Sequence, residues 1–133
     1  MWNKGEVMEC FFHSLMRDTE SPTKHNALIT FTVPDVGIVF RAQFKGDAKE
    51  VEYAGLLTLL EFIENNPQLF KNKTIEIYSD CFTLVNQVNR KMFCSRDLEP
   101  FLNMALTMQK KIPYSLNLIP ETDNPANQAI GII

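Results

Sequence analysis

The chain has 133 residues, of which 45% are hydrophobic and 22% charged, and its formal net charge is −3. This length fits one domain with its own core, so we expect residues 1–133 to form a single domain. The negative charge argues against binding of nucleic acid through the overall field of the protein. No stretch approaches the roughly 20 apolar residues of a membrane span, and the start lacks a secretory pattern, so we expect a cytoplasmic protein.

The first part of the chain contains three expected strands. Residues 6–16 have a strand pattern, and the polar run at 17–26 then interrupts it as a loop. A second strand is expected at 27–34, because its side chains alternate between the two faces of a sheet. A third strand follows at 37–44 after a turn at 35–37. Strands joined by such short connections are expected to pair as an antiparallel meander.

Helical spacing begins after Asp47, which precedes the first helical run as an N-cap residue does. We expect helices at 48–64, 81–89 and 96–111, strands at 74–79 and 114–120, and a short tail that turns helical. A meander followed by strands that helices connect predicts an α/β fold. Its sheet should be mixed and five-stranded, with helices packed on it.

Glu52 lies on the apolar side of the helix expected at 48–64. Steps of three and four residues carry it onto the line of Leu56 and Leu59, whereas Glu61 lies on the opposite side. A carboxylate at the edge of a core is expected to be paired, protonated or bound to a cation. A carboxylate early in a helix also complements the helix dipole while facing water, so both interpretations stay open.

Asp80 lies where the strand expected at 74–79 changes into the helix expected at 81–89. An aspartate directly before a helix is a favoured N-cap, and the local pattern alone favours this interpretation. The alternative is a metal ligand, because ligands of open α/β sheets gather at the carboxyl ends of strands.

Three segments taken together resemble the ribonuclease H family over about residue 36 to the end. The run 51–61, VEYAGLLTLLE, is similar to the family's first helix, whose opening glutamate is a metal ligand. The run IEIYSDCFTLVNQVNR looks like its fourth strand and next helix, where an aspartate is another ligand. The run 118–129 resembles the last strand and the start of the last helix. The order and spacing of these segments imply a ribonuclease H-like fold.

The resemblance implies a nuclease that cuts the RNA of an RNA–DNA hybrid with two divalent cations, magnesium or manganese, about 4 Å apart. The family holds these cations with four carboxylates. This sequence matches two of them, Glu52 and Asp80. Two divalent cations at that distance repel by roughly 16 kcal/mol even at an effective dielectric of about 20, which two carboxylates offset much less than four. We therefore expect weak binding of one metal ion or none.

The other positions of the family's site depart from its pattern. The first-strand aspartate falls on His13, although Glu9 and Asp18 are alternatives in a loose alignment, and the last position falls on Asn127, a neutral amide. Imidazole is a poor ligand for magnesium. Asp123, four residues before Asn127, is the remaining carboxylate of the terminal segment.

Three functional hypotheses remain. The first is a ribonuclease H-like domain without efficient nuclease activity that acts as a nucleic-acid-binding or protein-interaction module. The second is an active nuclease that takes a third ligand from Glu9, Asp18 or Asp123. The third is an α/β domain that forms a homo-oligomer and has no nucleic-acid role. Phosphate contacts would require a local basic patch, for which Arg90, Lys91 and Arg96 are candidates, although the sequence favours a solvated face of mixed charge for each of them.

Overall fold

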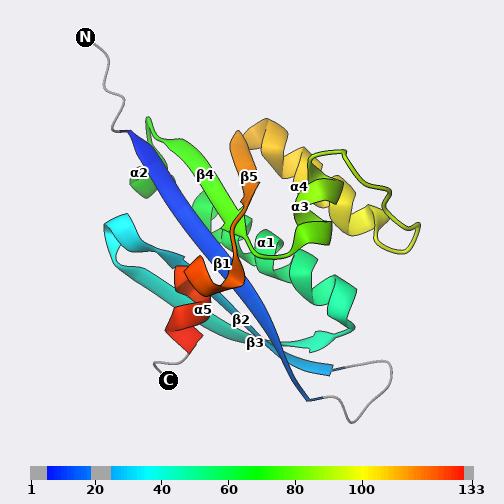
Figure 1. Ribbon diagram of the computed structural model, residues 1–133. Coiled ribbons are helices and arrows are strands. Elements are labelled where there is room, and N and C mark those ends of the chain that lie inside the picture. Colours follow the sequence, from blue (N-terminus) through cyan, green and yellow to red (C-terminus); the bar gives the residue numbers. More distant parts are fainter. Residues whose placement is uncertain (1–5, 19–24, 131–133) are drawn as a thin grey trace.

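The computed structural model describes residues 6–18 and 25–130, which form a five-stranded sheet flanked by helices (Figure 1). The strands are β1 (Val7–Asp18), β2 (His25–Val33), β3 (Ile38–Gly46), β4 (Thr74–Ser79) and β5 (Tyr114–Leu118). The helices are α1 (Ala48–Asn65), α2 (Pro67–Phe70), α3 (Phe82–Val88), α4 (Glu99–Lys111) and α5 (Pro125–Ile130), with short 3-10 turns η1 (Pro34–Val36) and η2 (Glu121–Asp123). Within the described residues, no helix is both long and apolar enough to cross a membrane.

The strands lie in the order β3-β2-β1-β4-β5. β1 and β2 pair antiparallel, as do β2 and β3, whereas β4 runs parallel to both β1 and β5. This arrangement confirms the α/β fold with a mixed five-stranded sheet. The central strand β1 pairs with β2 on one side and with β4 on the other, so its residues lie beside the end of β4.

The element boundaries differ from the expected ones where distant contacts decide them. The predicted loop at 17–26 is shorter, because β1 continues to Asp18 and that residue pairs with Asn26 of β2. The helix expected from residue 96 begins at Glu99, with Pro100 in its first turn. Helix α2 is absent from the prediction because Pro67 was expected only to end α1, although proline also suits the first turn of a helix.

Helices cover both faces of the sheet. α1, α3 and α4 lie on one face, and α5 crosses β1 and β2 on the other (Figure 1). α1 packs directly on β1, since a Cβ atom added at Gly55 would lie 2.9 Å from Cδ2 of Phe12 and 3.1 Å from Oγ of Ser14. This close approach brings the residues near Gly55 on α1 beside the middle of β1.

Two polar arrangements fix the position of α1. Asp47 caps the helix as predicted, because its side chain accepts hydrogen bonds from the backbone N–H groups of Lys49 and Glu50. Further along, the Tyr53 hydroxyl donates to Oε1 of Gln87 on α3 at 2.8 Å, and both side chains are buried. The N-terminal half of α1 is therefore held against both β1 and α3.

Candidate functional site

His13 and Asp80 form a buried pair at the centre of the candidate site. Nδ1 of His13, on β1, lies 2.6 Å from Oδ2 of Asp80, directly after β4, and the two side chains are only 7% and 8% exposed. An ionised carboxylate only accepts hydrogen bonds, so the imidazole Nδ1–H is the donor. The structure thus brings together two residues that the sequence comparison with the family placed at metal-ligand positions.

Asn124 is the second donor to the same carboxylate. Its Nδ2 donates to Oδ2 of Asp80 and to the backbone carbonyl of Phe12, both at 2.9 Å, and the residue is fully buried. Its Oδ1 accepts from the backbone N–H of Ala126 at 3.0 Å, which fixes the start of α5. Asn124 therefore joins β1, the end of β4 and α5.

The family resemblance placed Asn127, not Asn124, at the site. In the structure Nδ2 of Asn127 donates to the backbone carbonyl of Glu121 at 3.2 Å. The Asn124-Pro125 pair did indicate a turn. An asparagine before a proline favours a turn in which its side chain forms a hydrogen bond with the backbone two residues later. Nothing local indicated that its amide would reach Asp80.

The N-cap interpretation of Asp80 is wrong. α3 begins at Phe82, its N-cap residue is Cys81, and no side chain caps it. The nearby backbone N–H of Cys81 instead donates to Oγ of Ser79 at 3.0 Å. The carboxylate of Asp80 accepts from His13 and Asn124.

Glu52 completes the site from α1. Its Oε1 is buried and has no hydrogen-bond partner. Burial and, to a smaller extent, the charge of Asp80 raise the pKa of Glu52 to about 7, against the opposing effect of His13. The core-facing interpretation of Glu52 is therefore the correct one.

The pKa of His13 is also shifted by its surroundings. Burial disfavours the charged imidazolium, but the hydrogen bond and the charge of Asp80, together with the more distant carboxylates of Glu121 and Glu52, raise its pKa above the ordinary value. A protonated His13 would place a positive charge beside Asp80 where the family resemblance implies a carboxylate.

Among the described residues, neither Glu9 nor Asp123 forms a side-chain hydrogen bond with this cluster. Glu9 accepts a hydrogen bond from the Tyr78 hydroxyl at 3.3 Å, and Asp123 is exposed on η2. The side chain of Asp18 lies outside the described residues. The basic candidates are all exposed and lie in the segment between α3 and α4, namely Arg90, Lys91 and Arg96.

A divalent cation does not fit this donor set. Magnesium requires oxygen ligands with free lone pairs, whereas Oδ2 of Asp80 already accepts hydrogen bonds from two side-chain N–H groups. Across residues 6–18 and 25–130, no group of three or more His, Cys, Asp and Glu side chains is arranged to hold a metal ion. The residues at this site therefore do not match the two-cation chemistry that the family resemblance implies.

Replacing Glu52 by glutamine should stabilise the fold at alkaline pH. The pKa of Glu52 rises from 4.5 to about 7 on folding, so its contribution to stability falls as pH rises through this interval and stays low above it. Glu52→Gln removes this cost because the amide does not ionise. We expect a gain of about 2 kcal/mol at pH 8 and almost none at pH 4.5, from urea unfolding at both pH values.

The exposed Glu61 on the same helix provides the matched control, and Glu61→Gln should leave the free energy of unfolding unchanged at both pH values. A Glu52→Gln protein that is less stable than the wild type at pH 8 would show that Glu52 is ionised and favourably paired.

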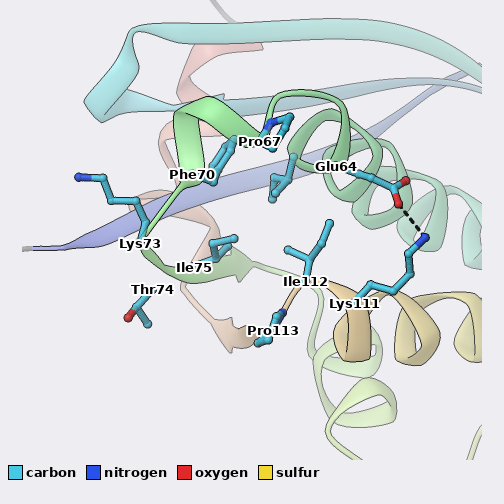
Figure 2. Close-up of a pocket in the computed structure, with 10 residues that line it drawn as sticks. Glu64, Pro67, Phe70, Lys73, Thr74, Ile75, Lys111, Ile112 and Pro113 are labelled. Atoms are coloured by element: carbon cyan, nitrogen blue, oxygen red, sulfur yellow. Dashed lines mark hydrogen bonds and ion pairs between the residues drawn. The ribbon is translucent and has the colours of Figure 1, made fainter.

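Two hollows flank α1. One, of about 480 Å³, lies beside the candidate site and is lined in part by Glu52, Tyr53 and Phe93. The other, of about 540 Å³, lies at the opposite ends of α1 and β4, where Figure 2 shows Phe70, Ile75 and Ile112 around it. Its charged groups are already paired, since Lys111 contacts Glu64 at 2.8 Å and Lys73 contacts Glu6 at 2.9 Å.

Comparisons with known proteins identify relatives by structure alone. No family model matches the sequence, and no curated protein matches it significantly. An RNase H1 isolated from compost by a metagenomic approach has a TM-score of 0.74 at 12% identity, covering 94% of this chain and 92% of that one. A complex of an RNase H1 with an RNA/DNA hybrid gives 0.70 at 13% identity, covering 90% and 91%.

RNase H1 from the archaeon Halobacterium salinarum gives a TM-score of 0.68 at 20% identity, with 92% of each chain covered. This coverage extends beyond the resemblance read from the sequence, which began at about residue 36. At such low identities the likeness concerns the path of the backbone and says nothing of the residues at the site.

Proposed function

Because this chain has a ribonuclease H-like fold, we propose that it is a nucleic-acid-binding domain that does not cut its ligand. The observation that carries this proposal is the pair of N–H donors, from His13 and Asn124, on one oxygen of Asp80. The carboxylate that best matches the family's metal site is already hydrogen-bonded by two side chains of the protein itself. A domain with this arrangement keeps the shape of a nuclease without the ligands for its cations.

The proposed loss of cleavage follows from charge. Phosphodiester hydrolysis of this family's kind depends on two cations that stabilise the attacking and leaving oxygens. Here the described cluster has two carboxylates, Glu52 and Asp80, and the raised pKa of Glu52, about 7, leaves that side chain partly neutral near pH 7. The cluster therefore lacks the negative charge that would hold two divalent cations together.

Binding is proposed to use the segment between α3 and α4, which projects beside the helical layer (Figure 1). Arg90, Lys91 and Arg96 are exposed there, and Phe93 between them is 84% exposed. Cations near an exposed aromatic ring suit a nucleic-acid strand, because the cations attract phosphates while the ring stacks on bases. A structural neighbour solved with an RNA/DNA hybrid supports the same class of ligand.

Charge reversal at Lys91 and Arg96 tests the binding surface. The net charge of −3 leaves affinity dependent on this local patch, so the double variant Lys91→Glu/Arg96→Glu should bind a labelled RNA/DNA hybrid or single strand about tenfold or more weakly. The slope of log affinity against log salt should also become shallower. Fluorescence anisotropy across a salt series measures both quantities.

The matched control is Lys45→Glu/Lys110→Glu, which reverses two exposed charges on β3 and α4 and should bind as the wild type does after allowance for net charge. Equal losses in the two double variants would contradict a local patch. Absence of binding, or binding that salt does not weaken, would contradict the proposed function and favour the oligomeric α/β domain instead.

A further inference from the structure

The hollow of about 480 Å³ beside the candidate site has the features of a nucleobase pocket. It lies between the N-terminal half of α1, α3 and the segment that precedes α4. We propose that it receives one unstacked base with hydrogen-bond donors on its edge, guanine above all, when the domain binds a single strand. This inference rests on the proposed function, because it concerns how the same nucleic acid would be recognised.

The polar lining of the pocket includes Lys49, Thr83 and Ser95, which carry donors, and one carboxylate oxygen that accepts no hydrogen bond. Glu52 lines the pocket, and its Oε1 is buried with no hydrogen-bond partner. The neighbouring Gln87 is fully used, since its Oε1 accepts from Tyr53 at 2.8 Å and its Nε2 donates to the backbone carbonyl of Phe93 at 3.1 Å. A ligand that pairs with Glu52 must therefore bring a hydrogen-bond donor, such as the N–H groups of a base edge.

The walls of the pocket are apolar and partly aromatic. Tyr53, Leu84 and Leu98 are buried, whereas Met92 and Phe93 are exposed at its rim. The Phe93 ring is 84% exposed and so remains available to stack on a flat ligand. A planar heterocycle with a polar edge matches these walls better than an alkyl chain, which would leave Glu52 unsatisfied.

The charges of the pocket distinguish a base from a phosphate. Glu52 inside the pocket repels a phosphate, while the exposed Lys49 also lines the pocket and attracts one, and the exposed Lys91 directly precedes the lining residue Met92. A strand bound here would keep its backbone at the rim and direct a base inward. Guanine offers two adjacent donors, N1–H and the 2-amino group, to a carboxylate, whereas adenine presents the N1 acceptor beside its single amino group.

The test uses labelled single-stranded uridine oligomers that carry one central guanine, inosine, adenine or uridine, with fluorescence anisotropy as the readout. Wild-type protein should bind the guanine oligomer about tenfold more tightly than the adenine oligomer, with inosine between them because it lacks the 2-amino group. Glu52→Gln should remove this preference, so that the guanine and adenine oligomers bind equally. Glu61→Gln, on the exposed side of the same helix, should keep the preference.

Thermal unfolding of each variant verifies that it is folded. Equal binding of guanine and adenine by the wild type, or a preference that survives Glu52→Gln, would overturn the base pocket while leaving nucleic-acid binding intact. Failure of every oligomer and of the RNA/DNA hybrid to bind would instead overturn the proposed function itself. A preference retained by Glu61→Gln and lost in Glu52→Gln supports the pocket.

Discussion

Replacement of His13 by alanine is expected to lower the free energy of unfolding by about 3 kcal/mol at pH 6. The change leaves the Asp80 carboxylate, whose side chain is 8% exposed, with Asn124 as its remaining side-chain donor. The raised pKa of His13 means that its contribution is full below about pH 6.5 and declines as pH rises through the pKa of the folded state. The loss measured by urea unfolding should therefore be smaller at pH 9.

His13→Gln provides the matched comparison, because its amide keeps an N–H donor for Asp80 and should recover part of the lost stability. A loss in His13→Ala that is the same at pH 6 and pH 9 would indicate that the charge of the imidazole plays no part. A loss below about 0.5 kcal/mol would indicate that Asp80 needs no donor from β1.

His13→Asp should make the fold depend on divalent cations. A third carboxylate beside Asp80 and Glu52 raises the repulsion within a buried cluster, so we expect clear destabilisation in a chelating buffer. Magnesium or manganese would relieve that repulsion, and a cation at 100 times its dissociation constant would restore about 2.7 kcal/mol. Thermal unfolding with increasing cation measures the effect.

The wild type, which lacks the third carboxylate, should show no comparable shift in melting temperature over the same cation range. His13→Asn removes the imidazole without adding charge and should also fail to respond. A wild-type response equal to that of His13→Asp would contradict the conclusion that this donor set does not fit a cation.

Local patterns were sufficient for most of the fold. Alternation placed β4 at Thr74–Ser79 as expected, and Asp47 indicated the start of α1, because both features depend on residues close in sequence. The ends of β1 and β2 were misjudged because the pairing of Asp18 with Asn26 depends on contact between separate strands. Local propensity does not carry that information.

The site was predictable only in part, for a similar reason. Glu52 and Asp80 were identified through the resemblance, and His13 as the departure from it. Asn124 was missed because its amide reaches Phe12 and Asp80, which lie 112 and 44 residues away in the sequence. The capping interpretation of Asp80 failed because these distant donors bind its carboxylate more favourably than the backbone of α3.

Cleavage of a labelled RNA/DNA hybrid in magnesium or manganese is the measurement that tests the central claim most directly. Protein concentrations that saturate the hybrid by anisotropy should leave its RNA strand intact on a denaturing gel, because the cluster of His13, Glu52 and Asp80 does not hold the required cations. Cation-dependent cleavage that Asp80→Asn abolishes would contradict the account and show that this chain is an active nuclease.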